Sequence, residues 1–110
     1  MAEVGRGEIW QFAFPGPNKR RPVLVLTRGE IISHLHSVTV APITSTIRGV
    51  PSEVIIGPES GLKNPSAINL DNVATVPQVG LRSYVGSVTP SVLRQVKDAL
   101  LFALGFDDED

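Results

Sequence analysis

The stretch RRPVLVLT, residues 20–27, places two arginines and a proline directly before an unbroken apolar run. The length of this run and its β-branched valines predict a buried strand. Pro22 is expected at the first position of the strand, where its missing N–H does little harm. Arg21 would then be held at the start of a rigid element, which suits a guanidinium that must bind an anionic group.

Short segments of the same kind recur on both sides of this stretch, each bounded by Gly, Pro, Asn or Ser. They predict strands at 8–14, 22–27, 36–43, 52–56, 66–70, 73–76 and 84–88. Strands this short and this evenly spaced are typical of a small barrel or sandwich. The chain shows no internal repeat and no linker, so its 110 residues are expected to form a single, mainly β domain.

The C-terminal segment has a different pattern and predicts one helix. Thr89 supplies an N-cap hydroxyl, and Pro90 is suited to the first helical position. Gly105 provides the stop. Between them runs one apolar stripe at helical spacing, made of Val92, Leu93, Val96, Ala99, Leu100, Ala103 and Leu104. Leu101 and Phe102 lie off this stripe, which favours a second copy of the chain, a homodimer, as the cover for the extra apolar surface.

Composition excludes several kinds of chemistry. The chain has no cysteine, which rules out disulfides, thiol catalysis and Cys-ligated zinc, and its two histidines are too few for a metal site by themselves. It shows neither a secretion signal nor an apolar run of membrane-spanning length, so a soluble cytoplasmic protein without a membrane partner is expected. Residues 107–110 are all acidic and are expected to be a disordered tail. Without these four, 7 acidic residues face 10 basic ones, enough for a local anion-binding face.

Polar groups at three strand ends are the candidates for a site. The first is Arg21, the second is Thr44 with the hydroxyls that follow it, and the third is the pair Asp71 and Asn72 between two apolar segments. Each has an ordinary structural explanation as well: a surface arginine, a turn threonine, and an Asx turn or bulge. His34 and His36 form a further candidate, an acid–base pair, although two residues of this spacing on a strand would suit solvent equally well.

The order of these pieces resembles the MazF/PemK family of toxin endoribonucleases. RGEIWQFAF at 6–14 is similar to that family's first strand, and RRPVLVLT at 20–27 to its Arg-Pro strand. VAPITST at 40–46 is similar to its strand ending in threonine, and SAINLDNVATV at 66–76 to its polar-interrupted strand. The resemblance covers nearly all of residues 6–105 and ends, as in the family, with a helix.

This resemblance implies an SH3-like barrel with a C-terminal helix, working as a homodimer that cuts single-stranded RNA without a metal or other cofactor. A cognate antitoxin with an acidic segment is the implied inhibitor. The catalytic pair of the family corresponds to Arg21 and Thr44. RNA contacts are expected around them, from Lys19, Arg20, Ser45, Asp71 and Asn72. Many relatives have a longer first loop with a Glu-Gln pair, whereas this chain has only PGPNKR, so the general base remains unassigned.

The chemistry fits these residue types. The 2′-hydroxyl of RNA can attack its own phosphorus, which gives a 2′,3′-cyclic phosphate and a free 5′-hydroxyl. The enzyme must orient the strand, stabilise the anionic phosphorane and assist proton transfer. Arg21 is assigned mainly to charge stabilisation, because arginine keeps its proton. Trp10 and Phe14 are candidates for stacking on bases, but a core role is favoured for both.

Two other functions stay open from the sequence. A CcdB-like toxin of the same shape traps a topoisomerase and cuts nothing, which would leave Arg21 and Thr44 without catalytic work. An SH3-like protein-binding module would usually show an aromatic groove. The chain has one Trp, one Tyr and four Phe, mostly within strand or helix patterns, which disfavours that module.

Overall fold

The computed structural model describes residues 4–16 and 20–107 of the chain. Within them the strands are β1 (Glu8–Ala13), β2 (Arg20–Val25), β3 (Ser37–Thr44), β4 (Glu53–Ile56), β5 (Ser66–Asn69), β6 (Ala74–Pro77) and β7 (Leu81–Ser87). The single α-helix among the described residues is α1 (Pro90–Leu104). Short 3₁₀ turns, η1 (Gly29–His34), η2 (Pro58–Ser60), η3 (Leu70–Asn72) and η4 (Gln78–Gly80), join some of the strands.

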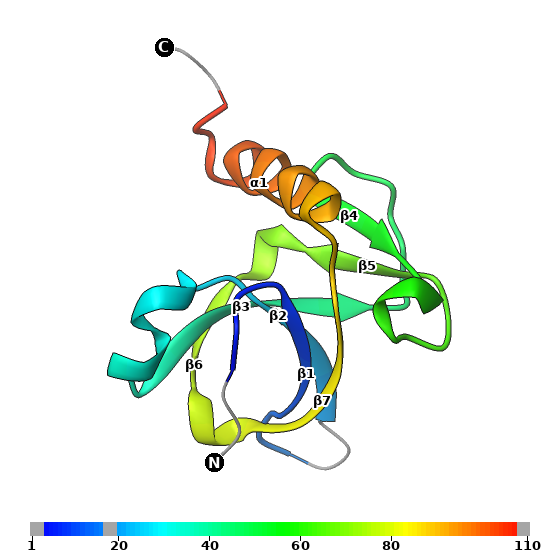
Figure 1. Cartoon of the computed structure of the whole chain (residues 1–110). Helices are drawn as coiled ribbons and strands as arrows, with labels where there is room; N and C mark the ends of the chain where they lie inside the picture. Colours follow the sequence, from blue (N-terminus) through cyan, green and yellow to red (C-terminus); the bar gives the residue numbers. More distant parts are fainter. Residues whose placement is uncertain (1–3, 17–19, 108–110) are drawn as a thin grey trace.

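All strand pairs are antiparallel, in the order β4-β5-β3-β2-β1-β7, with β6 paired to β3. Five strands curve around one core, while the β4–β5 hairpin continues from β3 beneath α1 (Figure 1). β6 and β7 are joined by η4, but over the described residues they do not pair. The predicted mainly β fold with a C-terminal helix is therefore confirmed, although the sheet curves like a barrel without closing.

The core has two parts, one on each side of the curved sheet. One lies inside the curve and consists of Trp10, Phe12, Val23, Val25, Ile32, Val38, Val40, Val76 and Leu81. The other lies under α1 and consists of Ile9, Leu24, Ala41, Ile43, Val54, Ile56, Ile68, Leu70, Val96 and Ala99. The indole N–H of the buried Trp10 donates to Glu8 Oε1 at 3.0 Å, and Phe14 packs against Phe12 with ring centroids 4.7 Å apart. Trp10 therefore has the core role that the sequence favoured, whereas Phe14 is half-buried and packs against the edge of that core.

The helix has the predicted limits. Thr89 Oγ1 accepts the N–H of Val92 at 3.2 Å, Pro90 opens the helix, and Gly105 ends it with φ of 79°.

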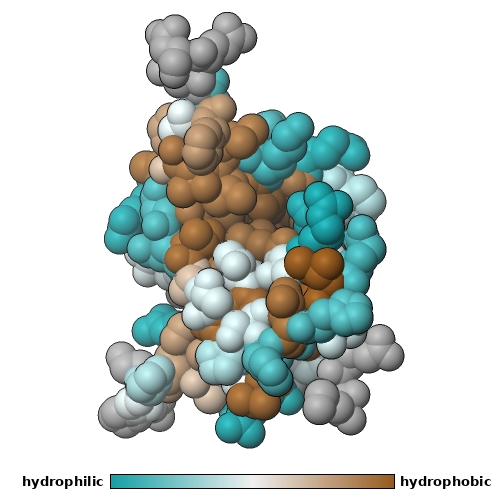
Figure 2. All heavy atoms as spheres, turned by 90° about the vertical axis from the view of Figure 1, so that its left-hand side faces the viewer, coloured by the Kyte–Doolittle hydropathy of each residue, from teal (hydrophilic) through white to brown (hydrophobic). Residues whose placement is uncertain are grey.

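No helix among the described residues has the length and apolar content to cross a membrane. Hydrophobic side chains gather at α1 and in the hollow beneath it (Figure 2). They include Phe102, Leu104 and Phe106, which are 47%, 54% and 73% exposed.

Strand limits differ from the prediction where backbone pairing, rather than side-chain pattern, decides them. β2 begins at Arg20, so Pro22 is inside the strand and not at its first position. β2 pairs with β3 only from Val23 onward, which leaves one flank open at Pro22 for a residue without an N–H. β7 begins at Leu81 instead of residue 84, because Leu81 is buried and pairs with Phe12. The expected disorder of the acidic tail falls largely on residues 108–110, outside the described part, and Asp107 is exposed.

Candidate active site

An open pocket of about 280 Å³ lies where β2, β3, β4 and η3 meet. Its size is near the lower limit of small-ligand pockets, roughly 300 Å³. Its lining is mostly polar, with two arginines, two threonines, two asparagines and one glutamate. The residues are Arg21, Pro42, Ile43, Thr44, Thr46, Arg48, Glu53, Asn69 and Asn72. Four of the polar residues that the sequence singled out are therefore brought together: Arg21, Thr44, Thr46 and Asn72.

Strand register explains why Arg21 and Thr44 meet. β2 pairs with β3 through Val23 opposite Pro42. Continuing this antiparallel register by two residues places Arg21 opposite Thr44, and residues opposite each other project from the same face. The described ladder stops at Val23, so both side chains stand at the open end of the strand pair, where a ligand has access.

Thr44 is prepared to act as a hydrogen-bond donor. Its Oγ1 accepts the N–H of Thr46 at 3.1 Å. A hydroxyl has two acceptor sites and one hydrogen, so this bond leaves the hydrogen of Thr44 available. Thr44 is half-buried and Arg21 is exposed, and both line the same pocket. A rigid hydroxyl beside a guanidinium fork can hold two oxygens of one phosphate group.

The pair Asp71 and Asn72 forms a tight turn, η3, with its two side chains in different surroundings. Asn69 Oδ1 accepts the N–H of Asp71 at 2.9 Å, an Asx-type bond that shapes the turn. The carboxylate of Asp71 accepts a hydrogen bond from the hydroxyl of the buried Ser52. Asn72 and Asn69 line the pocket, whereas Asp71 does not. The amide-bearing member of the predicted pair is thus the one beside Arg21.

Sequence reasoning missed two charged residues of the pocket, Arg48 and Glu53. Glu53 begins β4 and pairs with Asn69 of β5, and this register brings it to the pocket. Glu53 Oε1 accepts the N–H groups of Arg48 and Gly49, each at 3.0 Å, which fixes the segment that carries Arg48. In the sequence, an acid at the start of a short strand resembles any solvent-facing residue, and only the pairing of β4 with β5 distinguishes it.

Positive charge dominates the pocket. Arg21 and Arg48 bring two guanidinium groups against the one carboxylate of Glu53. Over the described residues, the only ion pair within 4.0 Å joins Arg28 and Glu30, so both pocket arginines keep their forks available. Two guanidinium groups, hydroxyls and amides form a site for an anionic, hydrogen-bonding ligand such as a nucleotide phosphate with its base.

Three further predicted contacts that the structure describes, Arg20, Ser45 and Asp71, do not line the pocket. Arg20 and Ser45 are exposed neighbours of Arg21 and Thr44, and consecutive strand residues such as Arg20 and Arg21 project to opposite faces. Lys19 falls outside the described residues. Lys19, Arg20 and Ser45 are close in the sequence to Arg21 and Thr44, and their expected part in RNA binding remains a prediction.

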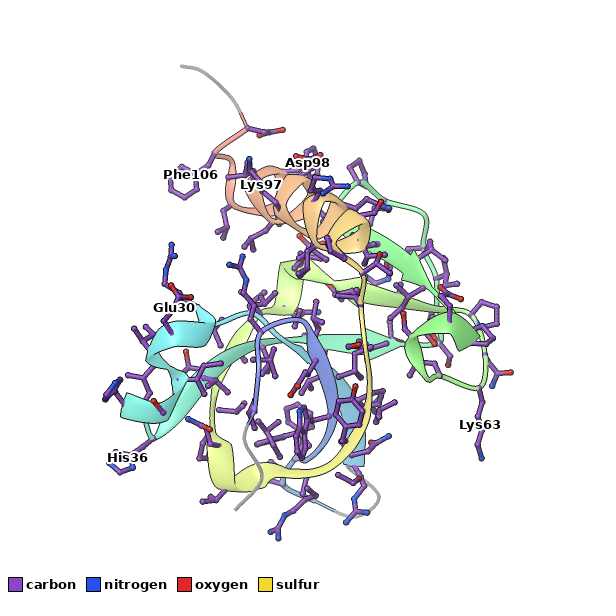
Figure 3. The ribbon with its side chains drawn as sticks, viewed as in Figure 1. Glu30, His36, Lys63, Lys97, Asp98 and Phe106 are labelled. Atoms are coloured by element: carbon purple, nitrogen blue, oxygen red, sulfur yellow. The ribbon has the colours of Figure 1, made fainter. Side chains whose placement is uncertain are left out.

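The two histidines are far from the pocket. His34 ends η1 and His36 precedes β3, so neither stands on a strand, contrary to the spacing argument for a pair on one strand face. All of β3 separates His36 from Thr44, which corresponds to roughly 25 Å in extended chain. Figure 3 shows His36 at the edge of the molecule, pointing outward. Across the described part of the chain, no three His, Asp or Glu residues are grouped as metal ligands would be.

Comparison with known families tests the resemblance seen in the sequence. Residues 5–104 match the family described as PemK-like, MazF-like toxin of type II toxin–antitoxin system. Endoribonuclease MazF3 of Mycobacterium tuberculosis is 40% identical over 90 residues, which cover 82% of this chain and 87% of the relative. Probable endoribonuclease MazF5 of the same organism is 40% identical over 102 residues, covering 90% and 91%. The match therefore includes every strand and the helix.

Solved structures agree with the sequence relatives. The Mycobacterium tuberculosis toxin MazF-mt6 superimposes with a TM-score of 0.83 and 37% identity, over 89% of this chain and 96% of that protein. An endoribonuclease from a mycobacterial species, solved in complex with its cognate antitoxin, gives a TM-score of 0.81 and 28% identity, over 93% and 95%. The structural similarity thus covers about nine-tenths of this chain.

Proposed function

We propose, from the premise that this chain belongs to the PemK-like, MazF-like toxin family of type II toxin–antitoxin systems, that it is a sequence-specific endoribonuclease. Its substrate is single-stranded RNA, including mRNA, and its reaction is attack of a 2′-hydroxyl on the adjacent phosphorus. The products are a 2′,3′-cyclic phosphate and a 5′-hydroxyl. Because the nucleophile belongs to the substrate, the reaction needs neither a metal-activated water nor a covalent enzyme intermediate.

The observation that carries this proposal is the meeting of Arg21 and Thr44 in one pocket at the open end of β2 and β3. Arg21 stabilises the phosphorane, because its planar fork donates to two oxygens at once. Thr44 donates its free hydroxyl hydrogen to the same group, while its oxygen is held by the N–H of Thr46. This is the donor arrangement that a developing negative charge on phosphorus requires.

Base recognition falls to the polar groups around this pair. Amide side chains both donate and accept, so Asn72 can read the edge of a splayed base. Lys19, Arg20, Ser45 and Asp71 extend the contacts along the strand. Single-stranded RNA is required because in-line attack and reading of base edges both need unstacked nucleotides.

Membership of the family implies two partners, an antitoxin and a second copy of the chain. A cognate antitoxin inhibits the enzyme with an acidic segment that occupies the cationic pocket, as suits a site with two arginines and one glutamate. A second copy of the chain covers part of the exposed apolar surface at α1, which includes Phe102 and Leu104 (Figure 2). The active form is then a homodimer with twice the 11.8 kDa mass, and it acts in the cytoplasm, where mRNA is available.

Incubation of the purified protein with mixed-sequence RNA in the presence of EDTA tests the proposal. We expect discrete fragments with 5′-hydroxyl ends, and no cleavage once the 2′-hydroxyl at the cleaved position is replaced by hydrogen. Cleavage that continues on the 2′-deoxy substrate would contradict the mechanism. Intact RNA would instead favour a toxin that traps a topoisomerase or a protein-binding module.

A further inference from the structure

We infer that Glu53 is a third catalytic residue, whose carboxylate takes the proton from the attacking 2′-hydroxyl. This inference rests on the proposed function, because it supplies the base that RNA cleavage needs. Neither Arg21 nor Thr44 can do this work. Arginine stays protonated in proteins, and a threonine hydroxyl is itself a far weaker acid and base than a carboxylate.

Glu53 reaches the pocket through the register and alternation of β4. It pairs with Asn69, which also lines the pocket. Its neighbour Val54 belongs to the buried cluster under α1, so Glu53 projects from the opposite face of the strand. The carboxylate is therefore on the polar face of the β3–β5–β4 sheet, together with the hydroxyl of Thr44.

The two carboxylate oxygens have different surroundings. Oε1 is held by two backbone N–H groups, from Arg48 and Gly49, each at 3.0 Å. Over the described residues, Oε2 has no hydrogen-bond or ion-pair partner. Glu53 is half-buried, so one oxygen anchors the side chain and the other remains available to a substrate. A preorganised group of this kind loses little freedom in the transition state.

Other proton acceptors are absent from the described lining. Besides Glu53, the lining consists of arginines, threonines, asparagines and apolar residues, none of which accepts a proton near neutral pH. Asp71 of η3 follows the pocket residue Asn69 by two positions, but its carboxylate is hydrogen-bonded to Ser52 and does not line the pocket. The charged residue Lys63 lies in the β4–β5 connection, which is at the opposite end of the hairpin from Glu53 (Figure 3).

Charged groups facing Glu53 are thus Arg21 from β2 and Arg48 from the segment before β4.

In the reaction, Glu53 takes the 2′-hydroxyl proton while the 2′-oxygen forms a bond to phosphorus. The bond from phosphorus to the 5′-oxygen then breaks, and this oxygen takes a proton from water in the open pocket. The carboxylic acid returns its proton to solvent, so charge and protons balance over one turnover.

Glu53→Gln separates the proton-accepting role from the anchoring role. The amide oxygen of glutamine can still accept from Arg48 and Gly49, but the side chain no longer takes a proton. We expect the single-turnover rate on an oligonucleotide with the mapped cleavage site to fall about 10²-fold or more, in the range of general-base contributions. RNA binding should be equal or tighter, because a negative charge is removed.

Glu59→Gln is the matched control. Glu59 Oε2 also accepts a backbone N–H, that of Gly57 at 2.9 Å, but Glu59 lies at η2, away from the pocket lining. This variant should cleave at the wild-type rate. Thermal unfolding of both variants checks that the fold is intact.

The pH dependence gives a second readout that a structural role would not change. An acidic limb seen in the pH–rate profile of the wild type should be missing from the residual activity of Glu53→Gln. A Glu53→Gln rate within threefold of wild type would overturn the inference, above all if Glu53→Ala is slow, since Glu53 would then only anchor the Arg48 segment. Wild-type protein that cuts no RNA would overturn the proposed function itself, a distinct result.

Discussion

The two faces of the β3–β5–β4 sheet differ in almost every respect. One face, which includes Ile68 and Val54, packs against α1 at Val96, and all three residues are nearly inaccessible to solvent. The opposite face carries Thr44, Asn69 and Glu53 and forms the wall of an open, polar pocket. Because side chains alternate along a strand, the same few residues of backbone build both faces.

This contrast separates stability from function within one set of strands. The helix-covered face holds the strands in register through apolar contacts. Register then decides which polar side chains meet on the other face, such as Thr44 with Arg21 and Glu53 with Asn69. Changes on the first face should therefore affect unfolding, and changes on the second should affect cleavage.

Ile68→Ala should give the largest effect and should act on stability. Ile68 is fully buried and pairs with Ile43 and Val54 at the centre of the covered face. Truncation of such a side chain costs about 2–5 kcal/mol of unfolding free energy, which denaturant titration measures. Below the unfolding transition, the cleavage rate per folded molecule should be little changed. A rate loss of 100-fold in folded protein would break the separation of the two faces.

Arg21→Ala should give the reverse result. Removal of a preorganised donor to the phosphorane should lower the single-turnover rate about 10²–10³-fold at saturating RNA. Because Arg21 is exposed, the free energy of unfolding should change by no more than about 0.5 kcal/mol. Arg21→Lys should restore only part of the rate, since a point charge lacks the two-pronged geometry of the guanidinium. A rate within threefold of wild type for Arg21→Ala would make Arg21 a structural residue.

The sequence predicted the covered face better than the pocket. The caps Thr89 and Gly105 and most of the apolar stripe of α1 are local signals, and the structure confirms them, although Leu104 at the end of the stripe is exposed. Arg21, Thr44 and Asn72 were also recognised, because each precedes, ends or interrupts an apolar run. Their roles in cleavage stay predictions.

Features that depend on distant pairing escaped prediction. Glu53 joins the pocket only because β4 pairs with β5 in one register, and no local pattern encodes that choice. The separation of Asp71 from Asn72 also depends on a distant residue, Ser52, which engages the carboxylate. The barrel left open between β6 and β7 is a third case, since strand spacing predicts curvature but not closure.

Arg20→Ala should give the smallest effect and sharpen the comparison within a single strand. Arg20 precedes Arg21 in β2 but projects to the other face and does not line the pocket. We expect weaker RNA binding with an unchanged single-turnover rate at saturation, because a phosphate contact contributes to affinity and not to the transition state.

Salt dependence identifies that contact. Each phosphate contact to a single strand adds about 0.7 to the slope of log affinity against log salt, so Arg20→Ala should reduce the slope by about that amount. Lys97→Ala removes the same charge from the outer face of α1 (Figure 3) and should leave the slope unchanged. If both variants lowered the slope equally, Arg20 would act only through net charge. If Arg20→Ala slowed cleavage at saturating RNA, the division between the two sides of β2 would fail.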